Sequence, residues 1–447
     1  MYKVLQNSGW LLVDKLSRLV LGLFIMAMIA GKIGPEAFGI WSFSLALTMI
    51  AGGISFLGQD KIVVREAVLH PDRETTIVAT SLLLRIAAGC IILVTCLLIT
   101  LLLKHGAMLY VWCTFITGLN IILQSFDVFD YYYQAHHTVQ KVIIPKVGVF
   151  VLFCGIRLWC LYAGAGLLTF VWLSCLELVV TYAVILIIYL KDTGNSMLRS
   201  VDRDLGKVLL TEGWPQAIAT FLILVYMKAD LLLLDMLGNP TQVGEYVAAV
   251  KVSELWYALP VLFATALLPD LINKRQQDEN SYWRSLESWI RLSFWVSCTL
   301  GLVITATAGS IIHRLYGELY PGSALILSVH IWAGIPVFIY TAVMQHHIIS
   351  GNYKNNLAAT IVGIVVNLVV NIILIPHTGG LGAAIATVLS YTAVGMVLLA
   401  KEKDPRLKVA MSRMILIRPA LTDIRKLYFT LRGFMTAVVP GKKTLTE

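Results

Sequence analysis

The sequence predicts an all-α integral membrane protein with about twelve transmembrane helices. Hydrophobic residues make up 58% of the 447 residues, only 14% are charged, and the mean hydropathy is +0.79. Soluble domains are less apolar and carry about 25% charged residues. Crossing a bilayer takes about 20 apolar residues. Segments of that kind recur at about 10–31, 37–57, 76–103, 108–130, 143–163, 167–190, 209–237, 243–270, 288–313, 322–348, 357–375 and 380–400.

The first predicted helix carries three charges at membrane depth. The uninterrupted apolar run from Leu19 to Ala30 has only 12 residues, so the helix must begin further upstream. Asp14, Lys15 and Arg18 then lie inside the membrane near one helix face, which must point to protein or water. In one interpretation Lys15 reaches back to the headgroups while Asp14 neutralises Arg18. In the other, the three residues line a polar cavity.

Turn and surface signals separate the next helices. The turn GKIGPEAFG combines a helix-ending glycine with Pro35 at a first helical position, which predicts a break between the first two spans. Residues 58–75 alternate charged and apolar residues with a helical period, which predicts an amphipathic surface helix. Pro215 predicts a bend near the start of the seventh span.

No metal or cofactor site is predicted. His136 and His137 are adjacent in the sequence and therefore do not share a helix face. The seven cysteines lie in apolar segments without a CxxC pair, and we interpret them as packing residues. Walker A, GxSxG and HExxH motifs are absent from the sequence. The chain is therefore not expected to be an enzyme.

The formal charge of +9 is informative through its placement. When the loops are assigned alternately to the two sides, 25 lysines and arginines fall on one side and three on the other, namely Lys32, Lys104 and Arg314. This bias predicts that both termini are cytoplasmic. It accounts for the positive charge without a nucleic-acid partner.

The chain also repeats itself. SGW at 8–10 and Gly39 match EGW at 212–214 and Gly244, with an offset of about 204 residues. The repeat predicts a six-helix lobe at 1–206, a second at 207–400, and a basic tail at 401–447 that either lies on the inner leaflet or is solvated. Two such lobes around a central cavity are typical of a transporter.

Further charges at membrane depth predict what this cavity binds. Lys228 lies deep in the seventh span, and Lys251 and Glu254 share a face of the eighth. With Lys15 and Arg18, the two lysines would form a ladder of cations, suited to an anionic solute with a lipid tail. The alternative is that they form structural pairs with Asp230 and Glu254.

Glu177 is the most central carboxyl group. No opposite charge lies one turn away on its own helix, so desolvation favours its protonated form. It is a candidate for coupling transport to protons or another cation, as are Asp14, Asp230 and Glu254. A hydrogen-bonded structural carboxylic acid is the alternative.

The segments NSGWLLVDKLSRLVLGL, GKIGPEAFG, LGQDKIVVRE, YMKAD and NLVVNIILIPHTGGLGAAIAT together resemble the polysaccharide-exporting branch of the multidrug/oligosaccharidyl-lipid/polysaccharide flippase superfamily, most of all the O-antigen flippases. The resemblance covers residues 5–400. It implies alternating access by two lobes, with a polyprenyl-diphosphate-linked oligosaccharide as substrate. It also implies a bacterial inner membrane and a polysaccharide polymerase or other assembly proteins as partners. Lys15, Arg18 and Lys228 are the residues that fit the cationic cavity expected in that branch.

Two other functions remain open. A drug or organic-cation antiporter would share the architecture, but it should offer acids and aromatic rings to its substrate where this sequence places bases. A membrane glycosyltransferase or polymerase would need a large periplasmic loop, whereas the predicted outer loops are short.

Overall fold

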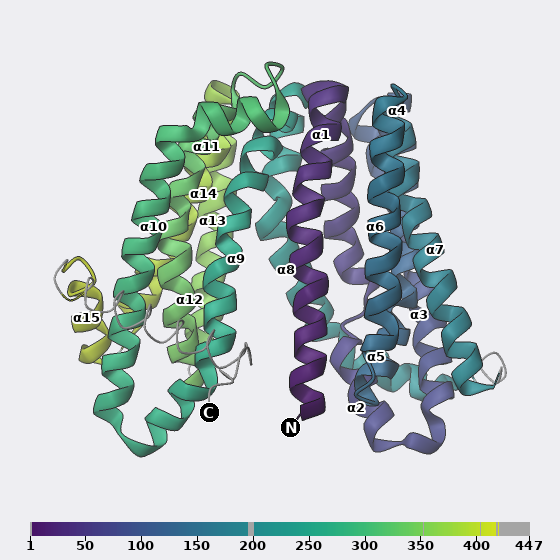
Figure 1. Cartoon of the computed structure of the whole chain (residues 1–447), viewed down its shortest axis with the longest axis horizontal. Helices are drawn as coiled ribbons and strands as arrows, with labels where there is room; N and C mark the ends of the chain where they lie inside the picture. Colours follow the sequence, from purple (N-terminus) through teal and green to yellow (C-terminus); the bar gives the residue numbers. More distant parts are fainter. Residues whose placement is uncertain (1, 195–200, 352, 403, 417–418, 420–447) are drawn as a thin grey trace, which may run out of the picture. The chain divides into compact units, whose positions relative to one another are not determined.

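The computed structural model describes residues 2–194, 201–351, 353–402, 404–416 and 419, with the side chains of residues 2–20, 262, 265–266 and 353–355 outside the description. Nearly all of the described residues are helical, and no strand occurs among them (Figure 1). The predicted all-α class is confirmed.

Two sets of long helices follow each other along the chain. The first set is α1 (Tyr2–Ser55), α2 (Asp60–Leu69), α3 (Glu74–Leu103), α4 (Met108–Leu123), α5 (Val128–Ala135), α6 (Gln140–Tyr162) and α7 (Leu167–Thr193). The second set is α8 (Arg203–Leu237), α9 (Pro240–Gln277), α10 (Glu279–Tyr316), α11 (Ser323–His330), α12 (Gly334–Ile349), α13 (Tyr353–Thr378), α14 (Gly380–Lys401) and α15 (Pro405–Ser412). Short 3₁₀ helices are η1 (Pro71–Arg73), η2 (Gln124–Asp127) and η4 (Ile331–Ala333).

Within the described part of the chain, ten helical stretches are long and apolar enough to cross a membrane. One of them contains two predicted spans, because α1 continues past Gly34, whose backbone there is non-helical with φ +83°. This is the break predicted from Gly34 and Pro35, and only glycine adopts such a φ without strain. Helix α9 coincides with a further predicted span. Each of the twelve predicted segments thus has a helical counterpart.

Two breaks were not predicted. The fourth span of each set is divided by a 3₁₀ turn, η2 between α4 and α5 and η4 between α11 and α12. Conversely, α8 runs through Pro215 as one helix. The internal repeat therefore extends to an irregularity of the backbone that the sequence comparison did not reveal.

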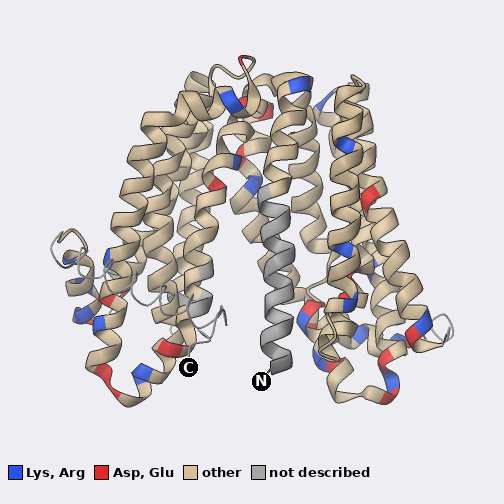
Figure 2. Cartoon of the chain, in the orientation of Figure 1, with Lys and Arg blue, Asp and Glu red and all other residues tan. Residues whose placement is uncertain are grey.

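The predicted amphipathic segment after the second span is helix α2, which buries Val63 and Ala67. In the tail, α15 buries Leu407 and Ala410 against α10 and α12 residues such as Tyr282 and Val343. The remaining tail beyond residue 419 lies outside the described residues. Lysine, arginine and acidic residues gather near α2 and α5 in the first set of helices, and near α15 and the start of α10 in the second (Figure 2).

Contacts divide the chain into two compact units. Unit 1 comprises Met1–Val252, Gly309–Ile326 and Leu368–Ala383, and unit 2 comprises Ser253–Ala308, Leu327–Asn367 and Ala384–Glu447. Unit 1 thus includes α8 and the first third of α9. The predicted lobes 1–206 and 207–400 are defined by the repeat, and their boundary stays a prediction.

Candidate functional site

The predicted cation ladder is described in part. Asp14, Lys15 and Arg18 lie on α1, but their side chains are outside the described residues. Lys228 is half-buried nine residues before the end of α8, and Lys251 is exposed eleven residues after the start of α9. At 1.5 Å per residue both lie roughly 14–16 Å from the turn that joins α8 to α9. Both lysines belong to unit 1, so the structure places two cations at matching depth on consecutive antiparallel helices.

The carboxyl groups near these lysines differ in their surroundings. Asp230 is buried on α8, where it accepts a hydrogen bond from the Tyr246 hydroxyl and one from the Leu231 backbone N–H at 3.0 Å. Glu254 is half-buried on α9, and its position belongs to unit 2. Asp230 is therefore held by α8 and α9 together, and its binding or coupling role stays a prediction.

Glu177 has a cationic partner that the sequence analysis missed. The Arg157 guanidinium on α6 lies 2.7 Å from its carboxylate, and Arg157 also donates a hydrogen bond to Ser174 Oγ at 3.3 Å. Both ionic side chains are buried. The expectation of an isolated carboxyl group rested on the residues of its own helix, and it is wrong because the partner comes from the neighbouring helix. Glu177 is part of an interhelical ion pair.

A second buried arginine donates hydrogen bonds at the break in the fourth span. Arg85 on α3 is 1% exposed and donates to the Gln124 carbonyl at 3.2 Å and to the Tyr131 hydroxyl at 3.3 Å. Its guanidinium carbon also lies 5.2 Å from the centroid of the Phe56 ring. A 3₁₀ turn changes the helical hydrogen-bond pattern, and Arg85 supplies a donor to the first carbonyl of η2.

In the second repeat, different residues bind the backbone at the equivalent 3₁₀ break. At the start of η4, the Tyr257 hydroxyl on α9 donates to the His330 carbonyl at 2.7 Å. The His330 ring is buried, with Nδ1 lying 2.7 Å from Ser253 Oγ. In both repeats, a side chain from a neighbouring helix thus binds the carbonyl group next to the break.

Beside η2, two carboxylates share one ammonium group. Lys146 Nζ on α6 lies 3.1 Å from Asp127 Oδ1 and 2.5 Å from Asp130 Oδ2. The Tyr182 hydroxyl on α7 donates to the same Asp127 oxygen at 2.8 Å. This cluster ties three helices of unit 1 together around a charged centre.

Unit 2 contains a polar cluster where α14 ends. Glu402 is 5% exposed and accepts hydrogen bonds from His347 Nε2 and from the Asp404 backbone N–H, both at 2.8 Å. Burial raises the pKa of the Glu402 carboxyl, but the two hydrogen bonds together with the positive charge of the neighbouring His346 and His347 outweigh burial and lower the pKa overall. The other ring nitrogen of His347 lies 2.9 Å from Asn356 Oδ1. The cluster fastens α12 and α13 to the segment that leads into α15.

At the opposite end of unit 1 from α2, the two repeats meet through equivalent residues. An ideal Cβ on Gly39 would lie 1.7 Å from the Pro240 carbonyl oxygen, and one on Gly244 would lie 2.0 Å from that of Pro35. Gly39 and Gly244 are the positions that the repeat matched. We call this contact between α1 and α9 the glycine seam, and any side chain larger than hydrogen would force the two backbones apart.

A buried ion pair joins the repeats at the same end. The ammonium of Lys104, the residue that follows α3, pairs with Asp235 on α8, and the Tyr110 hydroxyl donates to Asp235 Oδ1 at 2.6 Å. The Asp235 side chain is fully buried and that of Lys104 is 14% exposed. The ammonium also lies 5.0 Å from the centroid of the Phe43 ring. The sequence analysis counted Lys104 only as a loop charge; it is a structural cation.

The sequence contained a signal for several of these residues. Arg85 and Arg157 lie within predicted spans, where any ionisable residue is a candidate for a specific role. Lys104 was counted as a loop charge, and Lys146 stands near the start of the predicted span 143–163. Their burial follows from carboxylates on other helices, and these partners are not evident from sequence spacing.

Comparisons with known proteins agree with this architecture. Residues 4–273 match the family model described as "Polysaccharide biosynthesis protein", and residues 244–435 match the model described as "Lipid II flippase MurJ". A stretch of 171 residues is 28% identical to the probable flippase AglR of Haloferax volcanii. That stretch is 37% of this chain, and it spans only 36% of the relative's length.

Two solved structures have a similar fold. One is the inward-facing conformation of a multidrug resistance MATE family transporter of the MOP superfamily, with a TM-score of 0.69 and 14% identity over 90% of this chain and 96% of that one. The other is the lipid II flippase MurJ in an inward closed conformation, with a TM-score of 0.66 and 13% identity over 94% of this chain and 98% of that one. At such identities the likeness concerns the fold alone.

Proposed function

The chain belongs to the polysaccharide biosynthesis protein family, and on that premise we propose that it is a flippase for a polyprenyl-diphosphate-linked oligosaccharide. The resemblance to the multidrug/oligosaccharidyl-lipid/polysaccharide flippase superfamily is confirmed by the family models and the fold. The proposed substrate is a repeat unit of a surface polysaccharide such as O-antigen in lipopolysaccharide biosynthesis. It would move from the cytoplasmic to the periplasmic leaflet of a bacterial inner membrane by alternating access.

The position of Lys251 carries this proposal. Its side chain is exposed on α9, roughly 16 Å from the start of this long helix. A lysine at such a depth must face protein groups, water or a ligand, because facing lipid is too costly. With Lys228 at similar depth on α8, it offers two ammonium groups to a diphosphate. Lys15 and Arg18 on α1 are the further cations of the proposed site.

The alternative is a drug or organic-cation antiporter. The likeness to a multidrug resistance transporter favours it, because the fold is shared. The sign of the charges disfavours it, since an organic cation would be repelled by Lys228 and Lys251. Assays of polysaccharide export and of drug efflux distinguish the two functions.

Export in a bacterial strain deleted for its own flippase tests the proposal. We expect the wild-type chain to restore surface polysaccharide for at least one of several repeat units. Lys228→Ala should abolish export at normal membrane levels, because the diphosphate loses a cation at mid-membrane depth. Lys207→Ala, an exposed lysine on the same helix, is the control and should export normally. Full export by Lys228→Ala together with Lys251→Ala, or drug efflux without polysaccharide export, would refute the proposal.

Ion coupling belongs to the same proposal. Asp14, Asp230 and Glu254 are the candidate carboxylates, while Glu177 enters as the partner of Arg157. Vesicles that contain the purified protein and a fluorescent lipid-linked sugar would show transport with and without a pH gradient. Transport that is equal under both conditions would exclude protons as the coupling ion.

Both termini are proposed to be cytoplasmic. The 25-to-3 distribution of loop charges supports this orientation. Reporters fused after Lys191, Lys274 or Lys401 should therefore signal cytoplasm, and one fused after Gly238 should signal periplasm. A periplasmic signal at Lys401 would overturn the orientation or the number of spans.

A further inference from the structure

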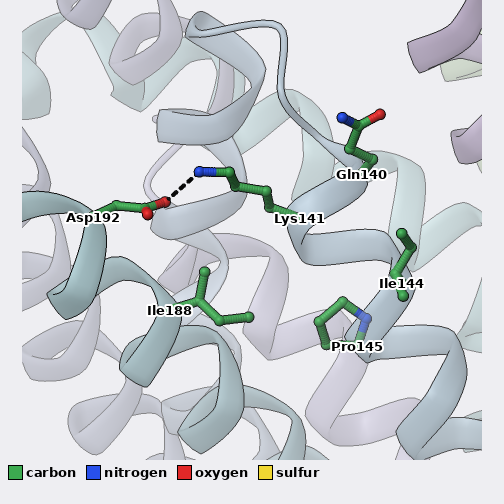
Figure 3. A pocket seen from close by; sticks show the side chains of 6 residues that line it. All are labelled: Gln140, Lys141, Ile144, Pro145, Ile188 and Asp192. Atoms are coloured by element: carbon green, nitrogen blue, oxygen red, sulfur yellow. Dashed lines mark hydrogen bonds and ion pairs between the residues drawn. The ribbon is translucent and has the colours of Figure 1, made fainter.

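A hollow of about 420 Å³ lies between the first turns of α6 and the last turns of α7 (Figure 3). Aliphatic side chains line part of it, Ile144 and Pro145 from α6 and Ile188 from α7. Lys141 and Asp192 face each other across it, and Gln140 completes the lining. The hollow is therefore apolar on one side and carries one charge of each sign on the other.

The two charged groups retain unused hydrogen-bonding capacity. The Lys141 ammonium and the Tyr133 hydroxyl both donate to Asp192 Oδ2, each at 2.8 Å. None of the described residues donates to the other carboxylate oxygen, Oδ1. Lysine has three N–H donors, and its side chain here is 46% exposed, while that of Asp192 is 32% exposed. Oδ1 can thus accept a further donor while Lys141 binds a further acceptor.

The helix ends strengthen this polarity. Lys141 is in the first turn of α6, near the positive end of the helix dipole, and Asp192 is in the last turn of α7, near the negative end. The antiparallel arrangement of α6 and α7 places both ends at the same border of the membrane-spanning segments. A ligand with a negative group beside Lys141 and a positive group beside Asp192 matches the site.

The surroundings indicate that this ligand is an amphiphile. Ile144 is 54% exposed, and exposed apolar side chains continue along both helices, including Leu152 and Ile187. In a membrane-spanning helix pair such a surface contacts acyl chains. The ligand therefore combines a zwitterionic head with an apolar tail.

We propose that this hollow binds phosphatidylethanolamine. The lipid phosphate lies beside the Lys141 ammonium, the lipid ammonium donates to Asp192 Oδ1, and an acyl chain packs on Ile144 and Ile188. Phosphatidylcholine has no N–H to donate, and phosphatidylglycerol has no cation. The hydroxyl groups of phosphatidylglycerol can donate but carry no charge. The site therefore selects a head group that is both cationic and a hydrogen-bond donor, independently of any transported substrate.

Native mass spectrometry of the purified full chain, with each of the three lipids added in turn, tests this site. A hydrogen bond to a charged group is worth about 1.5–3 kcal/mol, so phosphatidylethanolamine should be retained at least about tenfold better than the other two. Lys141→Met should lower the retention of all three lipids, because each carries the phosphate that this ammonium binds, and Asp192→Asn should remove the preference for phosphatidylethanolamine. Asp204→Asn and Lys207→Met, which change an exposed pair on α8, should keep it.

Asp192→Asn also changes the acceptor of the Tyr133 hydrogen bond, so a third variant tests the hollow without changing Asp192. Ile144→Trp fills the hollow and leaves both charges in place, and it should also lose the lipid. Equal retention of the three lipids by the wild type would overturn the proposal. Retention of phosphatidylethanolamine by both Lys141→Met and Ile144→Trp would overturn it as well.

Discussion

Replacing Gly39 by alanine is expected to abolish export and to destabilise the protein. The new Cβ would have to occupy a point 1.7 Å from the Pro240 carbonyl oxygen, so α1 and α9 must separate. Overpacking of this kind costs about 1–3 kcal/mol, and a carbonyl group on a helix backbone cannot rotate away as a side chain could. We expect a loss near the upper end of this range.

Two further substitutions make this result specific. Gly22→Ala on the same helix meets no atom within 4 Å, so it should export normally and gain about 0.5–1 kcal/mol from helix propensity. Gly244→Ala should behave like Gly39→Ala, because its Cβ would meet the Pro35 carbonyl. Export assays and thermal unfolding in detergent check all three. If Gly39→Ala matches Gly22→Ala, the glycine seam is not a close contact in the working protein.

The glycine seam also shows which features of the fold can be predicted from the sequence and which cannot. The repeat identified Gly39 and Gly244 as equivalent positions, and hydropathy placed every long helix. Equivalence does not imply contact, however. Each of the two glycines packs against the other's helix because of the way in which the two repeats associate. A sequence pattern within one repeat does not contain information on that association.

Pairing between helices is the main feature that the sequence could not supply. Glu177 was interpreted from its own helix, where positions three and four residues away were uncharged. Its partner Arg157 lies 20 residues earlier on α6, across a tight turn. The break at η2 likewise has no proline or glycine of its own, and it depends on a donor from Arg85. Such features arise from tertiary contacts that override local propensity.

The buried pair of Lys104 and Asp235 should have a large effect on stability. Asp235→Leu would leave the Lys104 ammonium without its counterion, and breaking a buried ion pair costs about 3–5 kcal/mol. We expect the low end of that range because Lys104 is 14% exposed and can regain some water. Lys104→Met should also destabilise the protein, because it leaves a fully buried carboxylate.

The double variant Lys104→Met with Asp235→Leu tests whether the charges act as a unit. Replacing both ions by apolar groups is often neutral, so the double variant should recover most of the stability that either single variant loses. The Tyr110 hydroxyl loses its acceptor in both Asp235→Leu and the double variant, so this loss cancels between them. The exposed pair Lys207 and Asp204, with side chains 76% and 89% exposed, should give a coupling of at most about 0.5 kcal/mol.

A double-mutant cycle of unfolding free energies measures this coupling. A double variant that loses as much stability as the two single variants together would mean that the two charges contribute independently. A large coupling would have a mechanistic consequence, because the pair joins the residue that follows α3 in the first repeat to α8 in the second, at the same end as the glycine seam. Under alternating access, opening this end requires the two repeats to separate. The pair would then break in every transport cycle, and the double variant should open this end more readily than the wild type.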